Sequence, residues 1–193
     1  MTHSRYSGLV QTKEAPDKPT SPGTDAAASA SAAFSACSAL YSGVGFNTSD
    51  SGPASLQNSS YAELLLDHAQ QLYNFALNAE GGQETYQESV PEIAASYGSS
   101  SFEDELTVAA LFLSLASNSS SLYDDAEGYY SQFSLNRRRG AYNWDSKAPA
   151  LAVLFAKIAS FYPSIGGNLG RWQSEAETYF DNVLDRVEKT KGM

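Results

Sequence analysis

The sequence is nearly without cysteine and histidine. Among its 193 residues the one cysteine, Cys37, excludes an internal disulfide, and the histidines are only His3 and His68. So few sulfur and imidazole groups argue against a zinc site and against a Ser-His-Asp or Cys-His triad. Cys37 lies in an Ala- and Ser-rich run at residues 26–40, where we expect it to be a buried small side chain. The available chemistry therefore belongs to carboxylates, hydroxyls and aromatic rings.

Positive charge is also scarce. Twelve Lys and Arg residues against 22 Asp and Glu residues give a formal net charge of -10. We expect no nucleic acid and no anionic membrane surface as partner, because phosphate groups are bound by clustered Lys and Arg. The one basic cluster, at residues 137–139, fits a solvated loop. No apolar run reaches the ~20 residues of a membrane-spanning helix, so no membrane span is expected.

The first 20 residues contain no apolar stretch typical of a signal peptide. Three Asn-x-Ser/Thr sequences, at Asn47, Asn58 and Asn118, nevertheless favour secretion, since such sequences accept N-linked glycans. An extracellular protein whose signal peptide lies outside this sequence satisfies both observations, and that is our expectation.

Apolar periodicity predicts an all-α fold of six helices, without strands. We expect the helices at residues 25–42, 60–79, 103–117, 121–133, 146–161 and 167–190. Residues 1–22 are a polar segment with three prolines, and residues 23–193 are expected to form one domain.

The helices alternate in character along the chain. Residues 103–117 and 146–161 are apolar on nearly every side, whereas residues 60–79, 121–133 and 167–190 are amphipathic. A helix that is apolar all round must be covered all round, and an amphipathic helix faces water on one side. The alternation predicts two concentric layers of helices, as in an α/α toroid, with an ordinary helical bundle as the alternative.

Each predicted inner helix begins at or just after an aspartate, namely Asp25, Asp104 or Asp145. One explanation is that these side chains cap the helices by accepting hydrogen bonds from free backbone N–H groups. The other is that the three helix starts face the same end of the domain and gather carboxylates in one cleft. The long loops expected at residues 80–102 and 134–144 would lie at that end, where function usually resides.

Four segments in order along residues 20–161 resemble family 9 of the glycoside hydrolases, a family of cellulase-type endo-1,4-β-glucanases. The matching segments are Pro-Gly-Thr-Asp-Ala-Ala at 22–27, Leu-Leu-Asp-His-Ala-Gln-Gln-Leu-Tyr at 65–73, Tyr-Gly-Ser-Ser-Ser-Phe-Glu-Asp-Glu-Leu at 97–106, and Asn-Trp-Asp-Ser-Lys at 143–147 followed by Val-Leu-Phe-Ala-Lys at 153–157. The sequence departs from the family pattern at Ser29, where Glu is usual, at Ser101, where Gly is usual, and at Val108 and Phe112, where Trp is common.

The resemblance implies that residues 23–193 are part of an (α/α)6 barrel, the glycoside hydrolase catalytic domain. It implies inverting hydrolysis of cellulose or another β-glucan by a monomeric enzyme without an organic cofactor. The family's catalytic base lies upstream of the matched segments and its acid lies downstream. We therefore expect an internal fragment with no catalytic residue of its own, inactive alone. Two alternatives stay open: another helical-toroid enzyme acting on glycans, or a non-catalytic helical scaffold that binds partners.

The resemblance also implies two kinds of site. Some family members bind a structural Ca²⁺, and the matching ligands here are the carboxylates of Asp104, Glu105 and Asp145 with the backbone carbonyls of Ser100 and Ser101. Calcium does favour such mixed oxygen ligands, and the alternative is that the aspartates are two helix caps beside a surface glutamate. Tyr97 matches a tyrosine near the family's sugar cleft, with core packing as the alternative.

Overall fold

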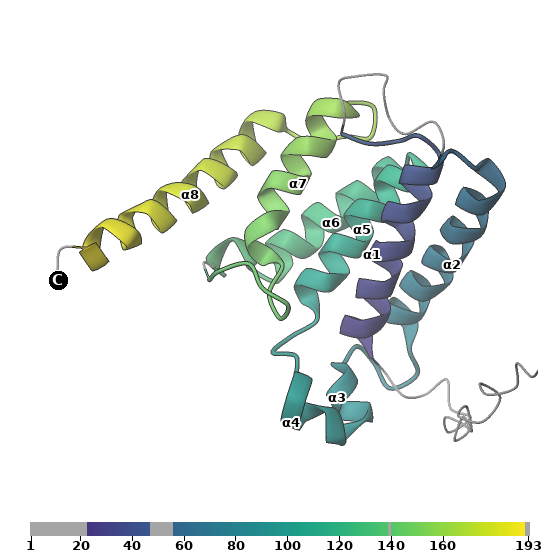
Figure 1. Ribbon diagram of the computed structural model, residues 1–193, viewed down its shortest axis with the longest axis horizontal. Coiled ribbons are helices and arrows are strands. Elements are labelled where there is room, and N and C mark those ends of the chain that lie inside the picture. The colour runs from purple at the N-terminus through teal and green to yellow at the C-terminus, as the bar shows by residue number, and fades with distance from the viewer. Residues whose placement is uncertain (1–22, 47–55, 139, 192–193) are drawn as a thin grey trace, which may run out of the picture.

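The computed structural model describes residues 23–46, 56–138 and 140–191 (Figure 1). Its six long helices are α1 (Thr24–Tyr41), α2 (Ser59–Asn78), α5 (Glu103–Ser117), α6 (Ser120–Gln132), α7 (Ala148–Phe161) and α8 (Leu169–Lys191). The six predicted helices are confirmed, each bound within two residues. The described residues contain no strand, and none of their helices is long and apolar enough to cross a membrane.

The segment expected to be a loop at residues 80–102 contains short helices that the sequence did not reveal. These are α3 (Tyr86–Ser89), a 3-10 turn at Pro91–Ile93 and α4 (Ala94–Tyr97). A second 3-10 turn, Leu135–Arg137, lies in the connection between α6 and α7. Helices of four residues bury no apolar stripe of their own, and hence leave no periodic signal.

The long helices form two layers, as the alternation predicted. α1 packs against both α2 and α5, α5 packs against α6, and α7 packs against α8. Smaller contacts join α5 to α2 and to α7, so α1, α5 and α7 form the inner layer and α2, α6 and α8 the outer one (Figure 1). Ten residues of α5 are buried, in agreement with its apolar character all round.

Close packing of α1 on α2 depends on small hydroxyl side chains spaced seven residues apart. Ser31 Oγ donates to the Ala69 carbonyl at 2.8 Å, Ser38 Oγ to the Ala62 carbonyl at 2.8 Å, and Thr24 Oγ1 to the Ala76 carbonyl at 3.4 Å. Seven residues are two helical turns, so the three hydroxyls form one row against an antiparallel partner. The Ala/Ser-rich composition of α1 therefore brings two backbones close together.

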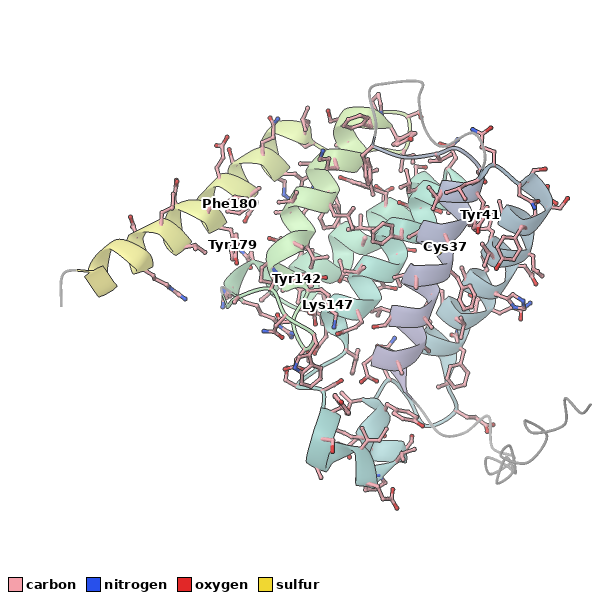
Figure 2. The ribbon with its side chains drawn as sticks, viewed as in Figure 1. Cys37, Tyr41, Tyr142, Lys147, Tyr179 and Phe180 are labelled. Atoms are coloured by element: carbon pink, nitrogen blue, oxygen red, sulfur yellow. The ribbon has the colours of Figure 1, made fainter. Side chains whose placement is uncertain are left out.

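The same orientation of α1 corrects the expectation for Cys37. Cys37 is exposed, because the hydroxyl row faces α2 and position 37 lies on a side of α1 that no other described helix of this chain covers (Figure 2). Position 37 directly precedes Ser38 and so lies off the buried row.

An aromatic cluster joins α6, α7 and α8. The rings of Phe155 and Trp172 stack with centroids 3.9 Å apart, and Tyr123 and Tyr130 meet Phe155 edge-on. Tyr123 also donates to the Phe155 carbonyl at 3.2 Å, and Trp172 Nε1 donates to Glu127 Oε1 at 2.8 Å. Buried aromatic rings with their polar atoms paired fix the angle at which the α7–α8 hairpin packs.

The six long helices form an open arc that begins with the α1–α2 pair and finishes with the α7–α8 pair (Figure 1). Apolar surface is exposed on the first pair and on the last. At the α2 end Tyr61, Leu64 and Phe75 are exposed, and at the α8 end Phe180 and Leu184 are more than half exposed. Between α5, α7 and α8 lies an apolar hollow of ≈ 520 Å³. It is lined in part by Val108, Phe112, Val153, Leu154 and Phe180. The expected covering of α7 on all sides is thus only partly met, and the arc has the form of a segment of a closed ring.

The seven-residue hydroxyl row gives a direct test of the packing. We expect Ser31→Val to lower the free energy of unfolding by about 1–3 kcal/mol. One methyl group replaces the hydroxyl, whose hydrogen bond is lost, and the second methyl group does not fit between α1 and α2. Ser29→Val, the same change at an exposed position of the same helix, should stay within about 0.5 kcal/mol of the parent. Urea denaturation at low micromolar concentration measures both, and equal losses for the two variants would contradict the packing.

Candidate functional site

The starts of α1, α5 and α7 lie on the same side of the domain, together with α3, α4 and residues 134–138 and 140–147 (Figure 1). We call this the loop end. Hydrogen bonds of the three predicted aspartates connect its segments, which confirms that these helix starts converge. None of the three aspartates caps its own helix, however, so that part of the expectation is wrong. Each carboxylate instead accepts from the backbone of another segment.

Asp25 joins the start of α1 to residues 80–102. Its Oδ1 accepts from the Tyr86 N–H at 2.7 Å, and its Oδ2 accepts from Ser99 Oγ at 2.5 Å. Tyr86 is the first residue of α3, so Asp25 caps that short helix from outside it. The neighbouring Thr24 N–H donates to the Glu84 carbonyl at 2.8 Å, which fixes the same segment again.

Asp104 joins the start of α5 to the start of α7. Its side chain is fully buried, and its Oδ2 accepts from the Lys147 N–H at 2.5 Å and the Ala148 N–H at 3.2 Å. Its Oδ1 lies 3.4 Å from Ser101 Oγ and 3.5 Å from the guanidinium of Arg138. A negative charge at the free N–H groups of α7 is favoured by the helix dipole as well as by the hydrogen bonds.

Glu105 is a buried carboxylate beside Asp104. Its Oε1 accepts from Lys147 Nζ at 2.7 Å, and its Oε2 is buried with no hydrogen-bond partner among the described residues. Burial raises the pKa of Glu105 to about 7, while the hydrogen bond from Lys147 acts in the opposite direction. The same ammonium group also donates to the carbonyl of Trp144, so Lys147 connects α5 to the loop before α7.

The five predicted calcium ligands are only partly brought together. Asp104 and Glu105 are adjacent, and Ser101 contacts Asp104 through its hydroxyl, but Asp145 Oδ1 accepts from the Ser100 N–H at 2.7 Å. In the part of the chain that the structure describes, no three Asp, Glu, His or Cys side chains group around one metal-sized point. Glu105 Oε2 is the buried carboxylate oxygen of this group that has no hydrogen-bond partner among the described residues. Calcium binding stays a prediction.

Exposed aromatic rings lie beside these hydrogen bonds and ion pairs of the loop end. Tyr97, the last residue of α4, is 72% exposed and does not belong to the core of this chain. Its ring meets that of Trp144 at an interplanar angle of 87°, with the centroids 6.2 Å apart, and Trp144 is itself 60% exposed. Tyr142, also largely exposed, lies near Lys147, Tyr179 and Phe180 along the apolar hollow (Figure 2). The loop end therefore presents aromatic faces to solvent.

Trp144 was not among the residues predicted to bind substrate. Its signal in the sequence was a tryptophan directly before Asp145, in a loop already assigned to this end. The loop is held by Asn143, whose Oδ1 accepts from the N–H groups of Asp145 at 2.8 Å and Ser146 at 3.0 Å. A rigid turn keeps Trp144 outward and next to Tyr97.

Comparisons with known proteins agree with the family resemblance of the sequence. The model of glycosyl hydrolase family 9 matches residues 9–193. Endoglucanase 14 of Arabidopsis thaliana is 33% identical over 177 residues, which cover 89% of this chain and 32% of that protein. Endoglucanase 18 of Oryza sativa subsp. japonica is 31% identical over 172 residues, covering 89% of this chain and 28% of its own length.

A solved structure agrees with both sequence comparisons. The endoglucanase from the termite Nasutitermes takasagoensis superposes with a TM-score of 0.68 at 28% identity, over 86% of this chain and 33% of that one. The chain thus spans about a third of the length of the relatives that it matches.

The raised pKa of Glu105 predicts how stability depends on pH. The folded chain holds the Glu105 proton up to about pH 7, whereas the unfolded chain releases it near the ordinary value of 4.5. The free energy of unfolding should consequently fall as the pH rises from about 5 to about 7, and level off above. Urea midpoints measured across this range with a chelator present test it. Glu105→Gln, which cannot ionise, should flatten the decline, and an unchanged slope in this variant would assign it to another group.

Proposed function

The chain belongs to glycosyl hydrolase family 9, and we propose that the longer protein of which it is part hydrolyses β-1,4-glucosidic bonds in cellulose and related β-glucans, with inversion at the anomeric carbon. The chain is a segment of an (α/α)6 barrel. The observation that supports the substrate most directly is the exposed pair Tyr97 and Trp144 at the loop end. We place the protein outside the cell and take it to act as a monomer.

The Tyr97–Trp144 pair suits a glucan for a physical reason. The flat face of a glucose ring carries mainly C–H groups, and an aromatic face is its natural apolar partner. Rings set edge to face form a corner, which offers one flat surface and one edge to successive sugars of a chain. The turn that carries Trp144 is fixed by hydrogen bonds from the Asp145 and Ser146 N–H groups to Asn143 Oδ1, so little entropy is lost there when a sugar binds.

The chemistry requires groups beyond those of this chain. Inversion uses a carboxylate base that activates water and a carboxylic acid that protonates the leaving oxygen, ~6.5–9.5 Å apart. At the loop end Asp25, Asp104 and Asp145 accept backbone N–H bonds, and Glu103 and Glu105 pair with Arg138 and Lys147. We therefore assign the acid and base to the remainder of the longer protein, and to this chain the role of scaffold and cleft wall.

Calcium binding at the loop end is a further part of the proposal. Its support is the buried, unpartnered Glu105 Oε2 next to the Asp104 carboxylate, since a cation would satisfy an oxygen that is otherwise costly to bury. The Lys147 ammonium already neutralises Glu105, so Ca²⁺ would share or replace that contact. The longer protein should then unfold at a higher temperature with calcium than with a chelator, and Glu105→Gln should remove the difference.

The aromatic corner is tested in the longer protein. We expect Trp144→Ala and Tyr97→Ala each to weaken binding of cello-oligosaccharides by about 3- to 10-fold, because each removes one apolar face. Tyr61→Phe, a mild change in the first turn of α2, far from the loop end, should leave the affinity unchanged. Isothermal titration calorimetry measures the dissociation constants. Unaltered affinity in both loop-end variants would mean that these rings do not contact the substrate.

The isolated 193-residue chain is expected to be inactive and to aggregate. It lacks assigned catalytic groups, and its uncovered faces at α2 and α8 expose apolar surface that a closed barrel would bury. Reducing-sugar release from carboxymethylcellulose should be absent for this chain and present for the longer protein, whose product should have the inverted configuration by NMR. Activity of the isolated chain that disappears in Asp104→Asn or Glu105→Gln would place the catalytic carboxylates here instead.

A further inference from the structure

Two Asn-x-Ser sequences lie on the side of the domain opposite the loop end. Asn58 directly precedes α2, and Asn118 directly follows α5. Because α1 and α5 both start at the loop end, their C-terminal ends, and with them the start of α2, lie at the far end (Figure 1). The third such sequence, at Asn47, lies outside the described residues.

Asn118 has the geometry of an accessible acceptor. It is exposed, adopts the left-handed conformation with φ 52°, and ends α5 through its backbone N–H, which donates to the Ser114 carbonyl. Among the described residues its side-chain amide makes no hydrogen bond. Ser120, the hydroxyl residue of the sequence, is exposed at the first turn of α6. A substituent on the Asn118 amide would project into solvent without disturbing either helix.

Asn58 is compatible with the same modification for a different reason. Its Oδ1 caps α2 by accepting from the Tyr61 N–H at 3.1 Å, whereas its Nδ2 is the atom to which a sugar would be joined. The cap and the modification thus use different atoms of one amide. Asn58, Ser59 and Ser60 are all exposed.

We propose that Asn58 and Asn118 carry N-linked glycans, so that the longer protein is glycosylated on the end of the barrel that faces away from its substrate. In the reaction Nδ2 attacks the anomeric carbon of a lipid diphosphate-linked oligosaccharide. The new C–N bond replaces the C–O bond to phosphate, Nδ2 loses a proton, and the lipid diphosphate leaves. The inference rests on the extracellular location in the proposed function.

The placement has a consequence for a polymeric substrate. A branched glycan beside Tyr97 and Trp144 would hold a solid glucan away from those rings. The two asparagines of the loop that follows α6, Asn136 and Asn143, are followed two residues later by Arg138 and Asp145, so neither can accept a glycan. Glycans at the far end add a hydrated surface and leave the aromatic corner open.

The test is peptide mass spectrometry of the longer protein from its natural source, before and after peptide-N-glycosidase, which converts each occupied Asn to Asp. We expect both sites to be occupied. Expression of the chain behind a secretory signal in yeast then permits variants, analysed in total cell protein because the glycan is attached before folding. Asn58→Gln and Asn118→Gln should each lose one glycan, Ser120→Ala should lose the glycan at Asn118 while keeping the asparagine, and Asn136→Gln should lose none.

Unmodified Asn58 and Asn118 in the natural protein would overturn the inference. Its failure is separable from failure of the proposed function, because the hydrolysis assay needs no glycan. An active protein without glycans at these residues refutes only the modification, and a glycosylated protein without activity refutes only the hydrolase. Removing the glycans from an active protein should leave release of soluble sugars within about 2-fold. Arg138→Ser creates a glycan acceptor at Asn136, and it should lower release from solid cellulose more than Arg138→Ala, which breaks the same ion pairs without adding a glycan.

Discussion

The Asp104 carboxylate bonds the start of α5 to the start of α7, and the arrangement of the loop end depends on this bond. The side chain is fully buried, and one of its oxygens accepts from the N–H groups of Lys147 and Ala148, at the start of α7. Charge-assisted hydrogen bonds of this kind contribute about 1.5–3 kcal/mol each, and a buried carboxylate left without partners costs more than that. The starts of α5 and α7 are therefore held side by side, although the direct contact between these two helices is small.

The same principle repeats around the loop end. Asp25 fixes α3, Asp145 fixes Ser100, and Lys147 spans Glu105 and the Trp144 carbonyl. These polar bonds give short segments without an apolar core of their own a defined position. The segments that these bonds position carry the exposed aromatic rings Tyr97 and Trp144. Function at this end thus depends on buried acidic residues that do not themselves touch a substrate.

The exposed apolar residues of the arc agree with its being part of a closed ring of helices. A helix pair in an (α/α)6 barrel has neighbours on both sides, and in this chain the α1–α2 pair and the α7–α8 pair each lack one neighbour. The exposed leucines and aromatic residues of α2 and α8 lie at those two places, whereas α5, which has neighbours on each side, is buried. The pattern of burial agrees with a chain that spans about a third of its relatives.

The sequence by itself determined the six long helices, their alternation between inner and outer layers, and the residues that gather at the loop end. These follow from apolar periodicity and from motifs at fixed spacing, which are local properties of the chain. Only the tertiary structure decided what the gathered residues contact. The aspartates cap other segments and not their own helices, Cys37 is exposed, and Trp144 lies beside Tyr97. Such pairings join residues up to 74 positions apart, as Asp25 and Ser99 are. The packing of one helix against another selects them, and no local pattern encodes it.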